Sequence, residues 1–252
     1  MSSTTRTDGR SSDALRPVEV NIGFQRNPEG SVLYRCGGTT VLVSASVDEG
    51  VRDWLKGQGK GWLTGEYAMH PRANPRRQSR DGRRGRVDGR SMEIQRLIAR
   101  SLRAAVRLDK LGERTITVDC DVIDADGGTR TASITAGYLA VVLALDSLRR
   151  RGLVGAGVLR EPVAAVSVGF VNGGPMLDLC YVEDSAAEVD LNVVATASGA
   201  MVEVQGTAEG EPLPKPDFDR LVDLALVGVS KLVETQKTAL ADAGVDWKLL
   251  LG

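Results

Sequence analysis

The chain has 252 residues, a formal net charge of −1 and a hydrophobic content of 42 %. This length allows one large or two small domains with a buried core, and the balanced charge excludes a molecule that is polycationic as a whole. No apolar run approaches the roughly 20 residues that span a bilayer, and the polar first residues lack the apolar core of a signal peptide. We therefore expect a cytoplasmic protein with no membrane partner.

The cysteines and the single histidine limit the kinds of catalytic and metal site that the chain could form. Cys36, Cys120 and Cys180 lie far apart without CxxC spacing, which is typical of reduced core thiols in a cytosolic protein. His70 is the only histidine and lies in an arginine-rich stretch, which argues against a Ser–His–Asp triad and against a Cys/His zinc site. Catalysis would have to use carboxylates, arginines, hydroxyls or a metal ion.

The first half of the chain begins with strand-like patterning. Alternating β-branched residues from Val18 to Val47 predict three strands. The stretch from Gly57 to Gly65 is glycine-rich, and residues 68–89 are strongly basic and lose periodicity. Apolar residues then recur with helical spacing and predict a helix from Ser91 to Leu111.

The second half continues with a predicted strand from Arg114 to Ile123 and a nearly all-apolar helix from Thr131 to about Arg150, which must be buried. Four short alternating runs follow: "AAVSVGFV", "MLDLCYVE", "DLNVVAT" and "MVEVQGTA". An amphipathic helix from Asp217 to about Leu240 comes last. This order predicts one α+β domain (an α/β two-layer arrangement) over residues 1–252.

The start of the apolar helix has the composition of an anion site. Gly127 and Gly128 precede it, and Arg130 occupies its first turn, where the partial positive charge of a helix favours acids instead. Glycines allow close backbone approach to a ligand, free N–H groups point at it, and a guanidinium suits phosphate. The hydroxyl groups that can cap these donors or donate to an oxyanion belong to Thr129, Thr131 and Ser133. An alternative is a capped helix whose arginine pairs with Asp124 or Asp126.

Two aspartates, Asp184 and Asp190, lie six residues apart in "LDLCYVEDSAAEVDLNVVATA". In one strand that spacing is roughly 20 Å, and in a helix the two side chains would face apart. We expect a hairpin in which "MLDLCYVE" pairs with "DLNVVAT" and brings them together. Opposed carboxylates repel unless they hold a cation, and Mg²⁺ often uses one or two carboxylates with substrate phosphates. The alternative is a solvated acidic hairpin end.

The tract from His70 to Arg90 holds eight arginines against two aspartates. Such a tract is typical of a flexible arm for polyphosphate, most economically nucleic acid. Because it has no aromatic residues, we expect it to follow the backbone instead of stacking on bases. A solvated disordered loop is the alternative.

Together these stretches resemble the ribonuclease PH family, the phosphate-dependent exoribonucleases that trim tRNA precursors in bacteria. Further motifs that carry the resemblance are "DGR" followed by "LRP", "NPEGSVL", "GKGWLTGEYAM", "GRSMEIQRLIARSLRAAV", "LGERTITVDCDVIDADGGTRTASITAG" and "VEVQGTAEG". They run in order from Asp8 to Gly210, and the final helix also fits. The first seven residues, expected to be a disordered tail, and the tail of residues 241–252 have no clear counterpart.

The resemblance implies roles for particular residues. It implies a phosphate site at Arg90, Gly128, Thr129 and Arg130, to which Ser133 adds a hydroxyl from the helix start. It implies catalytic, Mg²⁺-binding aspartates at Asp184 and Asp190. RNA would be led inward by Arg72, Arg76, Arg77 and Arg80.

The resemblance also implies a fold and an assembly. The family's fold resembles the second domain of a small-subunit ribosomal protein, and its members form homohexamers, as trimers of dimers. We expect RNA 3′ ends, foremost those of tRNA precursors, as substrates and no binding of DNA. Inorganic phosphate would be the co-substrate, nucleoside 5′-diphosphates the products, and the reverse reaction would add nucleotides from diphosphates.

Two other classes compete with this interpretation. A catalytically silent RNA-binding ring subunit would lack the two aspartates or the "GGTR" arginine, and all three are present. A small-molecule kinase would be expected to carry a phosphate loop with a lysine, which is absent here.

Overall fold

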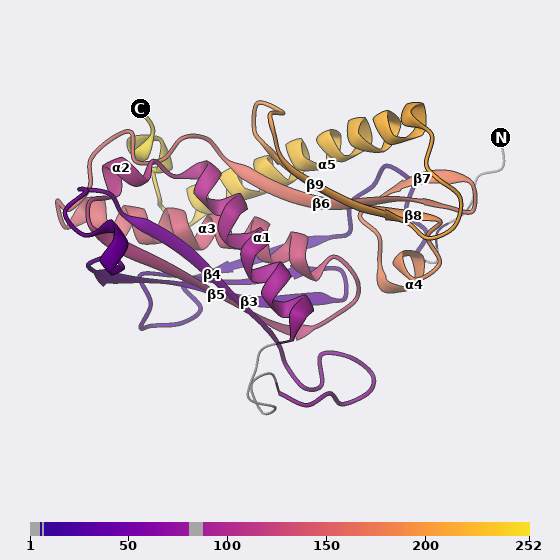
Figure 1. Ribbon diagram of the computed structural model, residues 1–252, viewed down its shortest axis with the longest axis horizontal. Helices are drawn as coiled ribbons and strands as arrows, with labels where there is room; N and C mark the ends of the chain where they lie inside the picture. Colours follow the sequence, from indigo (N-terminus) through magenta and orange to yellow (C-terminus); the bar gives the residue numbers. More distant parts are fainter. Residues whose placement is uncertain (1–5, 7, 81–87) are drawn as a thin grey trace.

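The computed structural model describes residues 6, 8–80 and 88–252. Its first sheet has five strands in the order β1-β2-β3-β5-β4, antiparallel except for the parallel pair of β4 and β5 (Figure 1). The strands are β1 (Val18–Ile22), β2 (Gly30–Cys36), β3 (Thr39–Glu49), β4 (Trp62–Met69) and β5 (Arg114–Asp124). Burial alternates along β3 and β5 because one face of the sheet packs on the core and the other faces solvent.

The second sheet has four antiparallel strands in the order β7-β6-β8-β9. They are β6 (Val163–Val171), β7 (Gly174–Leu177), β8 (Val189–Thr196) and β9 (Met201–Ala208), with the one-turn helix α4 (Tyr181–Asp184) between β7 and β8. Every residue of β6 is buried, since this strand lies between α3 and α5.

Four further helices and two 3₁₀ turns complete the fold: α1 (Gly89–Ala105), α2 (Leu108–Leu111), α3 (Thr129–Arg150), α5 (Lys215–Asp242), η1 (Asp53–Leu55) and η2 (Trp247–Leu250). The first sheet carries α1 and α3 on its buried face, and α5 covers the far face of the second sheet (Figure 1). Helix α3 contacts both sheets. The α+β, two-layer class expected from the sequence is confirmed.

Helix α3 meets the length and hydropathy of a membrane span, contrary to the expectation that no apolar run does so. Its most apolar window is 89 % buried within the fold. Packing between the two sheets therefore accounts for its apolar surface.

Several element boundaries differ from the predictions. Strand β4 lies in a stretch for which no strand was predicted, and α1 begins at Gly89 instead of Ser91, so the basic tract ends inside a helix. The predicted hairpin between "MLDLCYVE" and "DLNVVAT" is wrong, because β8 pairs with β6 and β9 while the first run ends in α4.

Both expected tails are also partly built into the fold. Arg6 is 4 % exposed, so the prediction that residues 1–7 are a disordered tail is wrong at this position. At the other end, α5 extends to Asp242 and Leu250 of η2 is fully buried. The three cysteines are free and buried, as expected.

Candidate active site

One cavity of about 560 Å³ brings together the four charged residues that the sequence singled out. Arg90 lies in the first turn of α1 and Arg130 in the first turn of α3, while Asp184 ends α4 and Asp190 lies on β8. The four come from three helices and a strand, yet all line the same cavity. Two arginines and two aspartates therefore face one space that is open to solvent.

The glycines at the start of α3 are required by the local geometry. Gly128 is the N-cap residue, with φ of +63°, a left-handed conformation that favours glycine. A Cβ atom on Gly127 would lie 2.6 Å from the carbonyl oxygen of Leu179, so no larger residue fits there. These constraints bring the start of α3 directly against the chain that leads into α4.

Arg130 has partners on two other elements. Its Nη1 donates to Oε1 of Gln205 at 2.9 Å and lies 3.4 Å from Oε2 of Glu93. It therefore does not make the pairing with Asp124 or Asp126 that the alternative would require. The side chain is 18 % exposed, which leaves it accessible from the cavity.

The hydroxyl groups at the start of α3 play different parts. Thr129 Oγ1 lies 2.9 Å from the Tyr67 hydroxyl, with either able to donate, and Thr131 Oγ1 donates to the Gly128 carbonyl. Ser133 is fully buried and donates to the carbonyl of Thr129 at 2.8 Å. Ser133 is not among the residues that line the cavity, and its contribution to phosphate binding stays a prediction.

The two aspartates approach each other without the predicted hairpin. Asp184 is exposed at the end of α4, and Asp190 is half-buried on β8. Although Asp184 as a residue is exposed, the surrounding protein partly desolvates its carboxyl group and raises its pKa. The charge of Asp190 raises this pKa further, and Arg90 and Arg130 oppose the rise. Burial also raises the pKa of Asp190, against the effect of Arg130 and with a contribution from Glu209. The carboxylates are thus incompletely neutralised by the protein.

This donor set fits a hard divalent cation. Among the described residues, no group of three or more His, Cys, Asp and Glu side chains forms a metal cluster. Mg²⁺ does not need such a cage, because it retains water and binds one or two carboxylates together with substrate phosphates. Asp184 and Asp190 are the residues that would hold it.

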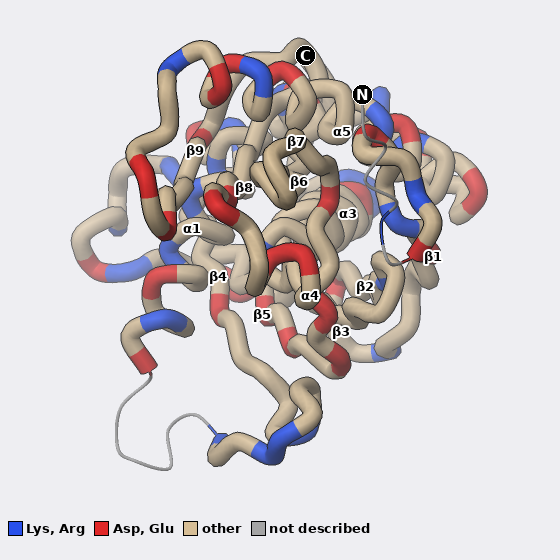
Figure 2. Tube along the Cα trace, turned by 90° about the vertical axis from the view of Figure 1, so that its right-hand side faces the viewer, with Lys and Arg blue, Asp and Glu red and all other residues tan. Residues whose placement is uncertain are grey.

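The described part of the basic tract starts on the fold and then projects from it (Figure 2). The His70 N–H donates to the carbonyl of Val122, and the Ala125 N–H to that of Ala73, which fixes the first residues beside the end of β5. The arginines predicted to bind RNA are all exposed: Arg72, Arg76, Arg77 and Arg80. Residues 81–87 lie outside the described chain, and Arg90 follows them in α1.

Asn192 and Gln205 are among the polar residues of the cavity that were not singled out from the sequence. Asn192 lies two residues after Asp190 on β8, and Gln205 is its partner on β9. The period of a strand could have indicated Asn192, since alternate residues share a face. Gln205 needs the β8–β9 register, which the sequence does not state.

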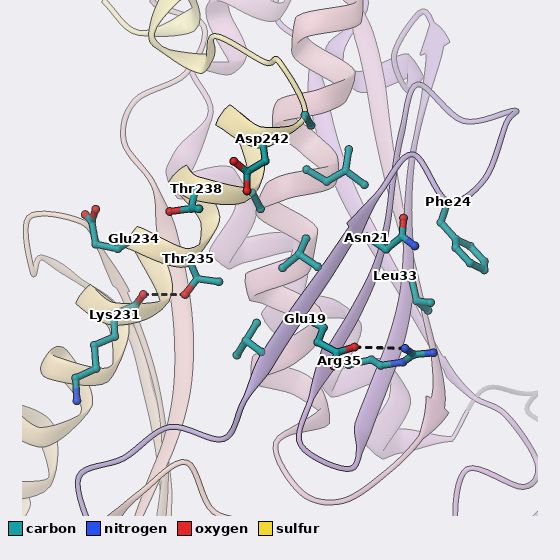
Figure 3. Close-up of a pocket in the computed structure, with 15 residues that line it drawn as sticks. Glu19, Asn21, Phe24, Leu33, Arg35, Lys231, Glu234, Thr235, Thr238 and Asp242 are labelled. Carbon is teal, nitrogen blue, oxygen red and sulfur yellow. Dashed lines mark hydrogen bonds and ion pairs between the residues drawn. The ribbon is translucent and has the colours of Figure 1, made fainter.

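A larger cavity, of about 950 Å³, lies between β1 and α5 (Figure 3). Figure 3 shows Glu19 paired with Arg35 on the strand side, and Lys231 and Thr235 on the helix side. None of the residues predicted to act in catalysis or phosphate binding lines it. The charged residues predicted to act in catalysis and phosphate binding line the smaller cavity instead.

The chain matches two models of one family: domain 1 of the 3′ exoribonuclease family over residues 14–145 and domain 2 over residues 161–228. Among solved structures, it is similar to Rrp46 from rice (Oryza sativa), with a TM-score of 0.75, 19 % identity and coverage of 93 % of this chain and 100 % of that chain. It is similar to a chain of the Archaeoglobus fulgidus exosome with RNA bound to the active site (TM-score 0.75, 25 % identity, 92 % of both chains). An archaeal exosome core gives a TM-score of 0.71 at 23 % identity, over 92 % of this chain and 91 % of that one.

These matches confirm the ribonuclease PH-type fold that the sequence motifs indicated. They do not distinguish tRNA-trimming enzymes from exosome subunits. The two family models together include the two arginines and the two aspartates of the cavity. The chain belongs to the 3′ exoribonuclease family.

Proposed function

We propose that this protein is a phosphorolytic 3′-to-5′ exoribonuclease that trims tRNA precursors in the cytoplasm. The observation that carries the proposal is the single cavity in which Arg90 and Arg130 face Asp184 and Asp190. Phosphorolysis must bring two anions together, the attacking phosphate and the scissile phosphodiester. A cavity with separate means of neutralising each anion meets that requirement.

In the proposed reaction, an oxygen of inorganic phosphate attacks the phosphorus of the 3′-terminal phosphodiester. The bond to the 3′ oxygen of the preceding nucleotide breaks, and that oxygen ends as a hydroxyl with the proton brought by the phosphate. The products are a nucleoside 5′-diphosphate and an RNA shorter by one nucleotide, and the reverse reaction adds nucleotides from diphosphates. No histidine is needed as a general base.

The residues of the chain divide this work between them. Arg90 and Arg130, with the N–H groups at the Gly128–Thr129 start of α3, hold and orient the attacking phosphate. Asp184 and Asp190 would hold Mg²⁺, which would neutralise charge on the scissile phosphate as negative charge develops on the leaving oxygen.

The basic tract supplies the track for the RNA. It is attached beside β5 and continues into α1, whose first turn carries Arg90. Its exposed arginines suit contacts with backbone phosphates, which give affinity without sequence preference. The likeness to a chain of an exosome with bound RNA supports RNA as the partner, and we expect no use of DNA.

We further propose that the protein assembles as a homohexamer, a trimer of dimers. The similarity to chains of exosome cores supports a ring. Sedimentation at micromolar concentration should give a mass of six copies of the 26.8 kDa chain. A monomer would contradict the proposed assembly.

The decisive assay incubates 3′-extended tRNA with and without inorganic phosphate and separates the nucleotide products. We expect nucleoside diphosphates only when phosphate is present, and trimming that stops near the mature 3′ end. Equal activity on an unstructured RNA of the same length would support a general exoribonuclease over a tRNA-trimming enzyme. RNA binding without any product would instead indicate a catalytically silent subunit.

A further inference from the structure

The first described residues of the chain lie against the back of the loops that carry the active site. We call Arg6 and residues 8–16 the N-terminal strap. The Leu177 N–H donates to the carbonyl of Ser12 at 2.7 Å, which joins the strap to the end of β7. Figure 1 shows the N-terminal end of the chain at the same end of the molecule as β7 and α4.

Arg6 fixes the segment that leads into α4. Its side chain is completely buried, and Nε and Nη2 donate to the two carboxylate oxygens of Glu183 at 2.7 and 2.6 Å. Nη1 donates to the carbonyl of Leu177 and Nη2 to that of Asp178. Glu183 in turn accepts from the N–H of Cys180 at 3.0 Å. The residue immediately before Asp184 is thus held from both sides.

Arg16 joins this segment to the start of α3. It donates from Nε and Nη2 to the carboxylate of Asp178, at 3.1 and 2.7 Å, and from Nη1 to the carbonyl of Asp126 at 2.5 Å. A Cβ atom on Gly128 would lie 3.0 Å from its Nη2, so the guanidinium lies directly under the helix start. Asp178 itself has φ of +54°, an uncommon backbone conformation that these bonds help to maintain.

The two loops also contact each other directly. The N–H of Tyr181 donates to Oδ1 of Asp126 at 3.2 Å. Gly127 packs against the backbone of Leu179 and Tyr181 so closely that no side chain fits between them. One hydrogen-bonded unit therefore contains the strap, the helix start that carries Arg130 and the turn that carries Asp184.

We propose that Arg6 and Arg16 are positioning residues that hold Asp184 at a fixed distance from Arg130. The inference rests on the proposed function, because the proposed reaction is what requires a fixed distance between Asp184 and Arg130. The metal-binding carboxylate and the phosphate-binding guanidinium must stay in register while two anions are brought together, and small displacements of such groups are costly in rate. Neither strap arginine touches the substrate, so each acts only through the residues that it holds.

The chemistry of the strap explains why both residues are arginines. Each side chain satisfies several acceptors in fixed planar geometry, which a lysine cannot do. The two hydrogen bonds from Arg6 compensate the charge of the buried Glu183 carboxylate. Removing one partner leaves a buried, uncompensated charge and releases the turn.

The test uses the full-length protein with Arg6→Gln, Glu183→Gln and Arg6→Lys. The control is Arg35→Gln, the same change at an arginine whose ion pair with Glu19 is exposed. Glu183→Gln is nearly isosteric and keeps its acceptor oxygen, so it should fold even if Arg6→Gln does not. The first readout is amide hydrogen exchange at Asp184 and Ser185, whose N–H groups close the turn of α4.

Arg6→Gln and Glu183→Gln should each accelerate this exchange at least tenfold and leave amides of the core strand β3 unchanged. The Mg²⁺ concentration for half-maximal phosphorolysis should rise about tenfold, and kcat at saturating Mg²⁺ should also fall, because a displaced Asp184 is costly in rate. For Arg6→Lys, both readouts should lie between those of Arg6→Gln and those of the unmodified protein. Arg35→Gln should change neither readout.

The outcomes separate this inference from the proposed function. Unchanged exchange in α4 and unchanged Mg²⁺ dependence in an active enzyme would overturn the positioning role. Uniform acceleration of exchange, core strands included, would show a general loss of stability and would also overturn it. Faster exchange confined to α4, in a protein without phosphorolytic activity, would support the strap and refute the function.

Discussion

We predict that Glu93 competes with phosphate for Arg130, so that its removal improves the use of phosphate. Oε2 of Glu93 lies 3.4 Å from Nη1 of Arg130, and Oε1 accepts from Gln205 at 3.0 Å. Glu93→Gln removes the negative charge and keeps an acceptor for Gln205. Arg130→Ala removes the cation itself. The two substitutions should therefore change the KM for phosphate in opposite directions.

The magnitudes follow from the exposure of each side chain. The pair is partly exposed, with 18 % for Arg130 and 43 % for Glu93, so the ion pair is worth about 0.2–1 kcal/mol. Its loss should lower the KM for phosphate by up to about fivefold. Hydrogen bonds from a charged donor contribute about 1.5–3 kcal/mol, so Arg130→Ala should raise that KM roughly 10- to 150-fold.

The assay measures the initial rate of diphosphate release from one RNA over a range of phosphate concentrations. RNA affinity, measured in parallel without phosphate, should change little in either variant. A higher KM in Glu93→Gln would show that Glu93 orients Arg130 productively and does not compete with phosphate. An unchanged rate for Arg130→Ala at limiting phosphate would refute the assignment of the anion site.

Three further predictions concern the carboxylates and the basic tract. Asp184→Asn and Asp190→Asn should each remove most activity, with the double variant little worse than either, because residues that act as one unit are non-additive; multiplicative losses would argue against a shared metal. Since the pKa values of Asp184 and Asp190 are both raised, the midpoint of the acid limb of the pH–rate profile should lie above the usual aspartate pKa of 3.8. It should move to lower pH as the Mg²⁺ concentration increases. The ionised carboxylates should likewise cost stability at neutral pH, so Asp190→Asn should stabilise the metal-free protein in thermal unfolding; no change in either measurement would contradict the raised values. Replacing Arg72, Arg76 and Arg77 with alanine should flatten the salt dependence of RNA binding by up to about two units, at about 0.7 per contacted phosphate, and leave cleavage of a short oligonucleotide unaltered; an unchanged slope would show that these arginines do not contact RNA.

The sequence predicted those features that depend on neighbours along the chain. The apolar spacing of α1, the all-apolar character of α3 and the alternation of β3 each identify an element without knowledge of the rest. Strand β4 was missed because its glycine is unusual in a strand. A Cβ atom on Gly65 would lie 3.1 Å from Ile98 and 3.3 Å from the backbone N of Ala99, so the glycine lets α1 pack closely. That reason appears only when α1 is in place.

The errors at the site have the same origin. The spacing of the two aspartates required a reversal of the chain, but α4 provides it instead of a hairpin. Arg6 lies in a polar stretch that resembles a disordered tail, and its partner Glu183 comes 177 residues later. Gln205 joins Arg130 through the register of β8 with β9. No local pattern encodes such pairings, because they arise from the packing of the two sheets.

The site lies between the two parts of the chain that match the two family models. This position explains how its arginines are kept at a fixed place relative to its aspartates. The arginines come from residues 14–145 and the aspartates from residues 161–228. Helix α3 starts at the cavity and then runs between the sheets, where it contacts β2, β3 and β6. Because both sheets fix this helix, the position of Arg130 relative to β8 is set by a close-packed core, which does not deform easily. In our proposal, the strap adds the same constraint to Asp184, which lies on the one-turn helix α4.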